Sequence, residues 1–176
     1  MKALGLDISL TATGVVLLEK FPGMRPRTDF ADVVQSTAQE ERYARIDRVA
    51  TEVFAKIVDG SPDVIVIEGL GQGGHGHVQA FVKVVELSGL IKLMLWANDY
   101  AWVEVPPSSL KKFVAGKGST AKGGMCRAVE ANWGFATKND NLADAYGLAA
   151  VGLALRGSLA LKPHQIEVLD GLKSGA

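Results

Sequence analysis

The sequence has little cysteine, no net charge and no long uninterrupted hydrophobic run. Its 176 residues include one cysteine, which excludes a disulfide framework and a cysteine-rich zinc module. Nineteen Lys and Arg residues balance nineteen Asp and Glu residues, so the overall charge favours no particular partner. Hydrophobic residues make up 48% of the chain and charged residues 22%, which excludes a disordered or fibrous protein and is typical of a globular domain.

Signals for membrane insertion and export are also missing. The longest apolar stretch, residues 78–102, contains Lys83, Glu86, Lys92 and Asp99, so it cannot span a bilayer as a plain helix. In the first ten residues, Asp7 interrupts the apolar run too early for a signal peptide. We therefore expect a cytoplasmic protein without a membrane partner.

The hydrophobic pattern predicts a single α/β domain. Runs without alternation, such as Val64 to Ile67, indicate strands that are buried on both faces, whereas three- and four-residue steps indicate helices. The expected fold is a mixed five-stranded sheet, its first three strands antiparallel, with helices on both faces. The predicted strands are 3–6, 13–18, 29–37, 64–67 and 101–105, and the predicted helices are 43–57, 78–97, 108–114, 120–133 and 139–156, followed by one helical turn near 165–172.

Acidic side chains stand at the ends of buried elements. Asp7 ends the first predicted strand and Glu68 ends the fourth, so the two carboxylates lie side by side if these strands are neighbours. Such a pair is stable only with a shared proton or a cation. Asp144 stands in an otherwise apolar helix, with Asp140 and Asn141 on the same helical face. These oxygen donors suit Mg²⁺, with Mn²⁺ as a substitute, and two such ions would clamp a phosphodiester.

These motifs together resemble the RuvC-type Holliday-junction resolvases of the RNase H-like superfamily. The resemblance covers residues 1–156 and rests on Asp7-x-Ser9-x-x-x-Thr13-Gly14, an apolar strand ending in Glu68, and Asn141-x-x-Asp144-Ala145. It implies a homodimeric endonuclease that cuts four-way DNA junctions by two-metal hydrolysis and leaves 5′-phosphate ends. By the same resemblance, Asp7, Glu68 and Asp144 are the metal ligands, and Lys111 and Lys122 are catalytic or phosphate-binding lysines.

The sequence departs from the family pattern at two places. The family often has an acid or a histidine where this chain has Asn141, so either Asp140 or Asn141 is the fourth ligand. Several bacterial members place an aromatic wedge shortly after the glutamate, where this chain has GLGQGG with Leu70 as its bulky apolar residue. This version looks more like phage-type members, some of which cut a wider range of branched DNA.

A basic segment and a glycine-rich loop are the expected DNA contacts. Residues 106–127 contain no acid, and lysines beside a GKGS loop can follow phosphates without reading bases. In the glycine-rich loop we expect Gly73 and His75 to touch DNA. The predicted lysine contacts are Lys111, Lys112, Lys117 and Lys122.

The predicted domain boundary lies at residue 157. Residues 1–157 form the nuclease domain, and residues 158–176 form a partly flexible C-terminal extension. The helix 78–97 has more apolar surface than one sheet face can cover, so it is the candidate dimer contact; we place Trp96 in the core. Two alternatives remain: a non-catalytic branched-DNA-binding module of the same fold, and a nucleotide-binding domain of the actin-like or sugar-kinase type, which would need a second copy of the domain.

Overall fold

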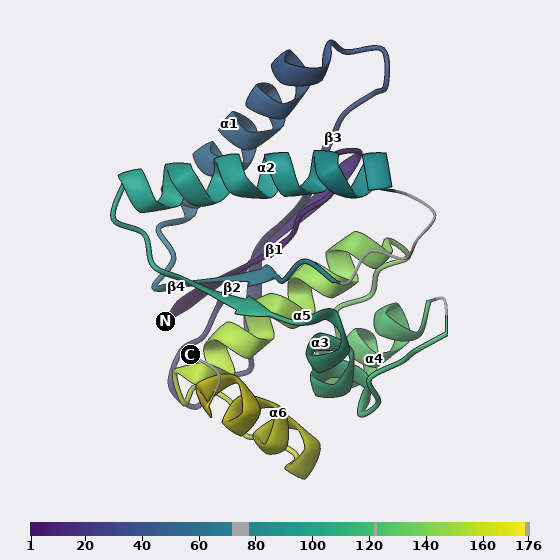
Figure 1. Cartoon of the computed structure of the whole chain (residues 1–176). Helices are drawn as coiled ribbons and strands as arrows, with labels where there is room; N and C mark the ends of the chain where they lie inside the picture. The colour runs from purple at the N-terminus through teal and green to yellow at the C-terminus, as the bar shows by residue number, and fades with distance from the viewer. Residues whose placement is uncertain (72–77, 122, 175–176) are drawn as a thin grey trace.

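The computed structural model describes residues 1–71, 78–121 and 123–174, without the side chains of 173 and 174. Its elements follow the predicted order, and a sixth helix is added at the C-terminal end (Figure 1). No helix within these ranges is long and apolar enough to cross a membrane. The strands are β1 (Lys2–Asp7), β2 (Ala12–Glu19), β3 (Arg27–Gln35), β4 (Val64–Glu68) and β5 (Trp102–Val105), and the helices are α1 (Arg42–Gly60), α2 (Val78–Ala97), α3 (Pro107–Ala115), α4 (Gly124–Trp133), α5 (Asp140–Leu155) and α6 (Pro163–Ser174).

The five strands form one mixed sheet in the order β3-β2-β1-β4-β5. The first three strands pair antiparallel, and β1, β4 and β5 pair parallel, as the sequence predicts. The parallel pairing requires crossover connections, which α1 provides between β3 and β4 and α2 between β4 and β5. The pairing places β1 and β4 side by side in the middle of the sheet.

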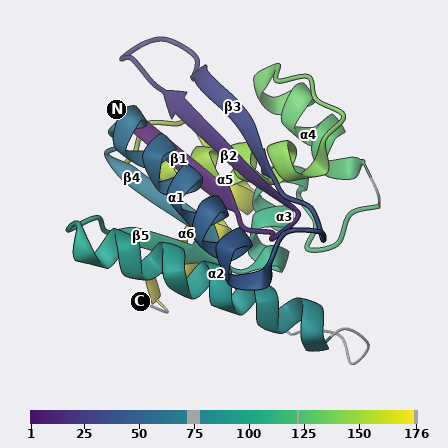
Figure 2. The ribbon, with the colours of Figure 1, turned by 90° about the horizontal axis from the view of Figure 1, so that it is seen from above.

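Helices cover both faces of the sheet. Figure 1 shows α1 and α2 on one side, and α3, α4, α5 and α6 on the other. In the view from above, α1 lies over the sheet and runs nearly along the strands, and α2 lies toward the β5 edge (Figure 2). Each face has its own hydrophobic core, because alternate residues of a strand point to opposite sides. In β1, Ala3 packs on the α5 side, whereas Leu4 and Leu6 pack against α1 and α2.

Helix α5 lies directly on the backbone of the central strands. A Cβ added at Gly5 would meet the Ala145 carbonyl oxygen at 2.0 Å, and one at Gly14 would meet the Asn141 carbonyl oxygen at 2.3 Å. Gly14 pairs with Asp7 in the β1–β2 ladder. Two glycines on adjacent strands therefore allow the first half of α5 to approach the sheet next to Asp7.

The structure corrects several boundaries and one burial prediction. Helix α4 begins at Gly124 and not at 120, because Gly123 has a positive φ of 70° that no helix contains. The single predicted turn near 165–172 is the twelve-residue helix α6, which packs on α3 and buries Val168 and Leu169. Trp96 is 70% exposed, so its predicted core position is wrong.

Candidate active site

Strand parity brings Asp7 and Glu68 to the same face of the sheet. Val64 and Val66 of β4 pack on the α5 side, so Glu68, two residues further on, has the same orientation. By the same alternation, Asp7 lies on the face where Ala3 packs. The β1–β4 ladder ends at the pair of Leu6 with Ile67, so the two acids immediately follow on neighbouring parallel strands. Their predicted juxtaposition is confirmed.

Asp144 joins this pair from α5. It stands next to Ala145, whose carbonyl oxygen lies over Gly5 of β1, so the close packing of α5 delivers its carboxylate to the same sheet edge. One of its oxygens, Oδ1, is buried and has no hydrogen-bond partner among the described residues. A buried carboxylate oxygen without a donor is costly, so it needs a proton or a cation. Asp144 is therefore a candidate for binding a cation and not for stabilising the fold.

Burial and neighbouring negative charges raise the pKa values of all three acids. Burial, followed by the charges of Glu68 and Asp144, raises the pKa of Asp7 well above its usual value. Burial and the Asp144 charge raise the pKa of Glu68 to about 7. Burial, followed by the charge of Asp140, raises the pKa of Asp144 to about 6 against the opposing effect of Lys111. Carboxylates with raised pKa values that converge from three separate elements are typical of a functional site.

Lys111 is the positive charge of this site. It comes from α3, and its charge lowers the pKa values of both Glu68 and Asp144. A cavity of about 180 Å³ lies beside these groups, lined by Lys111, Thr120, Asp140 and Asp144 among others. The sequence missed Thr120, because the segment 120–123 resembled the start of a helix. The two consecutive glycines Gly123 and Gly124 are the signal that could have placed the start of the predicted helix after this threonine.

Asp140 and Asn141 have different contacts. Asn139, and not Asp140, caps α5: its Oδ1 accepts from the backbone N–H groups of Asn141 and Leu142. The Cys126 thiol donates to Asp140 Oδ1 at 3.3 Å, and Cys126 is buried. The Asn141 side-chain amide donates to the Ala12 carbonyl oxygen at 2.8 Å and so fastens α5 to the start of β2. Asp140 is thus an exposed acid beside the cavity, whereas Asn141 has a structural contact.

The remaining predicted DNA contacts are distributed differently. Lys117 is exposed after α3. Lys112 forms an ion pair with Glu167 of α6, so it already has an acidic partner. Gly73, His75 and Lys122 lie outside the described residues. No group of three or more His, Cys, Asp or Glu side chains is already arranged as a metal-binding cluster in the part of the chain that the structure describes.

Curated proteins of known name resemble the chain over most of its length. It is 28% identical over 162 residues to the "Crossover junction endodeoxyribonuclease RuvC" of Carboxydothermus hydrogenoformans, an alignment that covers 90% of this chain and 99% of that protein. It is 27% identical over 154 residues to the protein of the same name from Gloeobacter violaceus, with 86% and 87% covered. No family model matches the chain.

Solved structures show the same fold. The structure of Thermus thermophilus RuvC has a TM-score of 0.74 at 21% identity and covers 92% of this chain and all of that one. The same protein in complex with a Holliday junction substrate has a TM-score of 0.76, and a yeast mitochondrial Holliday junction resolvase has 0.63 at 12% identity. The arrangement of the sheet and helices is therefore the RNase H-like arrangement predicted from the sequence, and the chain is similar to the curated RuvC proteins over most of its length.

Proposed function

We propose that this protein is a metal-dependent endonuclease that resolves Holliday junctions. The observation that carries the proposal is the convergence of Asp7, Glu68 and Asp144 beside Lys111, in a chain homologous to RuvC over nine tenths of its length. The substrate range extends to other branched DNA, and the chain acts as a homodimer because a four-way junction needs two symmetric cuts. The cytoplasmic location stays a prediction.

The residues present fit a hard divalent cation. All the predicted ligands offer oxygen donors, Asp144 Oδ1 lacks a partner among the described residues, and burial and neighbouring negative charges raise the pKa values of the acids. A bound cation would attract the carboxylates and so offset the repulsion between their negative charges. We propose Mg²⁺, or Mn²⁺ in its place, as two ions held by Asp7, Glu68 and Asp144 with Asp140 as the added acid. Asn141 is the weaker fourth candidate, because its amide nitrogen already binds β2.

The side chains around this site have separate roles in the proposed hydrolysis. When bound, the ions supply an activated water and neutralise charge on the phosphodiester, and the products carry 5′-phosphate ends. Lys111 lies where it can hold a phosphate oxygen near Glu68 and Asp144. Lys122 is proposed from the sequence as the second lysine that stabilises developing charge. Cys126 holds the Asp140 carboxylate toward α4.

The first test is cleavage of a labelled four-way junction in Mg²⁺. We expect paired nicks on opposite strands whose ends DNA ligase can reseal, because ligase requires a 5′-phosphate. The Asp7→Asn variant should bind the junction without cutting it. If the wild-type protein binds the junction but does not cut it in Mg²⁺ or Mn²⁺, the result favours the alternative hypothesis of a non-catalytic branched-DNA-binding module. Absence of both binding and cutting would remove the junction as substrate.

Loss of Lys117 should reduce the salt dependence of junction binding. This exposed lysine lies in the acid-free segment beside the cavity, so Lys117→Ala should lower the slope of log Kd against log salt by about 0.9 for one lost phosphate contact. Lys112→Ala should have a smaller effect, because Glu167 already binds this lysine. Lys20→Ala, in the β2–β3 hairpin, is the matched control and should leave the slope unchanged. An unaltered slope in Lys117→Ala would show that this lysine only faces solvent.

Helix α2 is the proposed dimer contact. Its solvent-facing side carries an apolar stripe that lies within about 80° around the helix, with Gly89 at its centre and open space over that glycine. An exposed apolar stripe of this size marks an interaction surface, and a central glycine lets a second helix approach closely. The stripe consists of Val78, Val82, Val85, Leu93 and Trp96, which are 66%, 40%, 37%, 57% and 70% exposed.

A charge in the middle of this α2 stripe should separate the dimer. Val82→Asp would bury one carboxylate from each copy in an apolar contact, which should raise the dimer dissociation constant about a hundredfold. Sedimentation velocity over a concentration series measures this change. Val58→Asp, on the exposed side of α1, introduces the same charge at a similarly exposed valine and should leave the oligomeric state intact. If the Val82→Asp protein stays dimeric, the dimer contact is not the α2 stripe.

A further inference from the structure

The β1–β2 loop, residues 8–11, follows directly after Asp7. Because β1 and β4 run parallel and end at the same sheet edge, this loop lies next to the acid cluster. Its Leu10 side chain is 6% exposed and packs in the hydrophobic core that α1 and α2 cover. The loop is therefore anchored to the fold at the edge of the sheet that carries the candidate active site.

The carbonyl oxygens of the last three residues of this loop are bound by the protein itself. Thr13 Oγ1 donates to the Ser9 carbonyl oxygen at 2.6 Å and accepts from the Ser9 N–H at 3.2 Å. The Ser36 N–H donates to the Thr11 carbonyl oxygen at 3.1 Å. The Ser36 hydroxyl donates to the Leu10 carbonyl oxygen. All three acceptors are therefore already bound within the protein.

The donors of the same loop are left without partners. The backbone N–H groups of Leu10 and Thr11 have no hydrogen-bond partner among the described residues. The hydroxyl oxygens of Ser9 and Thr11 lie 3.2 Å apart, and Thr11 is exposed. Because a hydroxyl hydrogen can rotate, both side chains can turn toward the same ligand. A loop whose acceptors are bound and whose N–H and hydroxyl donors remain suits an anion, and a phosphate in particular.

A buried arginine contacts this loop from α1. Arg45 is 7% exposed, and its Nε donates to Ser36 Oγ at 2.7 Å and its Nη2 to the Leu10 carbonyl oxygen at 3.4 Å. It forms no ion pair with an acid in the part of the chain that the structure describes, and the nearby acid Glu40 binds Arg48 instead, at 2.8 Å. A buried charge without a counter-charge is costly. An anion bound to the loop would supply that counter-charge.

We propose that the β1–β2 loop binds a backbone phosphate of the DNA, next to the phosphate that is cut. This inference rests on the proposed nuclease function and adds a second phosphate site to it. The hydroxyls of Ser9 and Thr11 and the two unpaired N–H groups bind the phosphate oxygens. Arg45 is a positioning residue, which fixes the loop and supplies positive charge beneath it. Lys111 comes from α3 on the other face of the sheet, so the two sites hold the strand from opposite sides of the acids (Figure 1).

The test replaces single phosphates of a four-way junction, at each position around the branch point, by methylphosphonates, which carry no charge. Binding is measured with Asp7→Asn protein, so that no cutting interferes. Replacement at one position should raise Kd about tenfold. When Ser9→Ala and Thr11→Val are added, replacement at that position should raise Kd about threefold or less, because a contact that is already lost cannot be lost again. Thr51→Val, which removes an exposed hydroxyl from α1, is the matched control and should leave the tenfold effect intact.

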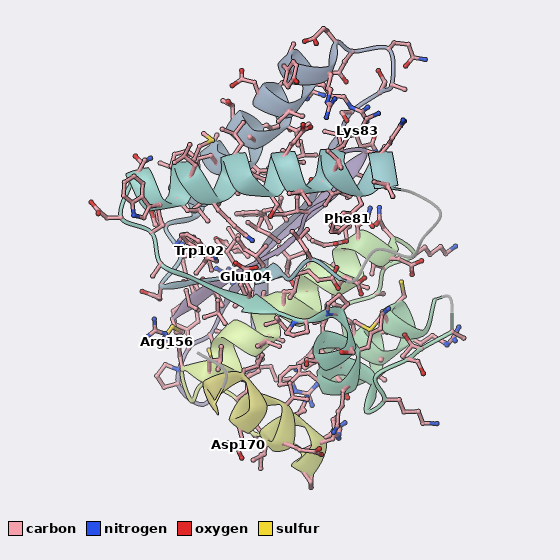
Figure 3. The ribbon with its side chains drawn as sticks, in the orientation of Figure 1. Phe81, Lys83, Trp102, Glu104, Arg156 and Asp170 are labelled. Atoms are coloured by element: carbon pink, nitrogen blue, oxygen red, sulfur yellow. The ribbon has the colours of Figure 1, made fainter. Side chains whose placement is uncertain are left out.

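Substitutions of Arg45 test its positioning role separately. Arg45→Met should reduce the methylphosphonate effect as loss of the two hydroxyls does, whereas Arg45→Lys, which keeps the charge, should retain more of it. Arg156→Met is the control for loss of an arginine and should leave the effect unchanged. Figure 3 labels this exposed residue, which follows the last turn of α5, at the end of that helix far from Asp144. Thermal midpoints identify any variant that has lost its fold.

The inference is overturned if every methylphosphonate position keeps its full effect in the protein with Ser9→Ala and Thr11→Val. It is also overturned if ATP or ADP binds the wild-type protein with an affinity that depends on Thr11 while no methylphosphonate position does, because the loop then holds the phosphate of a free nucleotide. If the wild-type protein binds the junction without cutting it, the nuclease proposal fails, and the methylphosphonate series still decides whether the loop holds a DNA phosphate. Absence of junction binding would overturn both.

Discussion

Asp144→Asn should abolish junction cleavage and at the same time stabilise the protein in the absence of metal. The substitution removes a carboxylate whose charge raises the pKa values of Asp7 and Glu68, so the charge repulsion inside the folded protein falls. It also removes a charged oxygen that has no hydrogen-bond partner among the described residues. We expect cleavage to fall by about a thousandfold or more, because ion binding supplies several kcal/mol of transition-state stabilisation.

The pH dependence of stability follows from the same pKa values. Glu68, with a pKa of about 7, and Asp144, with a pKa of about 6, hold protons in the folded state at pH values where the unfolded chain has released them. The folded state then binds more protons than the unfolded state, so the free energy of unfolding falls as pH rises from about 4 to about 7. In metal-free protein, thermal midpoints should therefore decrease across this window, and less steeply in Asp144→Asn.

Thermal denaturation in EDTA and in Mg²⁺, at several pH values, measures both effects. Added Mg²⁺ should raise the midpoint of the wild-type protein at pH 7.5 and have little effect near pH 5, where protonated acids cannot bind it. Asp99→Asn is the matched control, because Asp99 is exposed and has a positive φ of 59° that asparagine tolerates. If Asp144→Asn loses activity and stability together, Asp144 supports the fold and does not bind a cation.

The sequence predicts these acids for a physical reason. A buried strand that ends in a carboxylate constrains where that carboxylate can lie, and the alternation of side chains gives Asp7 and Glu68 the same face once β1 and β4 are neighbours. The choice between Asp140 and Asn141 could not be made in the same way, because both lie within one helical turn of Asp144. It depends on two contacts between distant parts of the chain, Asn141 with Ala12 and Cys126 with Asp140.

The start of α4 and the exposed position of Trp96 were not predictable for a similar reason. Residues 120–133 have a helical pattern, but the positive φ of Gly123 delays the helix and leaves Thr120 beside the acids. Helix α2 is apolar nearly all round, so its periodicity does not show which side packs on the sheet. The packing of Leu87, Ile91 and Leu95 in the core is what shows that Trp96 faces the solvent.

Among single methyl groups that could be added near the site, the one added by Gly5→Ala should destabilise the protein most. The new Cβ would stand 2.0 Å from the Ala145 carbonyl oxygen and 2.5 Å from the Ala149 nitrogen, which are both backbone atoms of α5. Backbone atoms cannot rotate away as a side chain can, so α5 must move off the sheet. Overpacking of this kind should cost about 3 kcal/mol or more, and lower the thermal midpoint by about 6 °C or more.

The measurement is the thermal midpoint together with cleavage at a temperature where the variant stays folded. Because Asp144 belongs to the turn of α5 that Gly5 supports, the displaced helix should also carry its carboxylate away from Asp7, and cleavage should fall further than the loss of folded protein explains. Gly118→Ala is the control, since a Cβ there meets its nearest neighbours at 3.6 Å and 3.8 Å, which is ordinary contact. A Gly5→Ala protein with wild-type stability and cleavage would mean that α5 does not lie on β1 as described, and that the convergence of Asp7 and Asp144 has another cause.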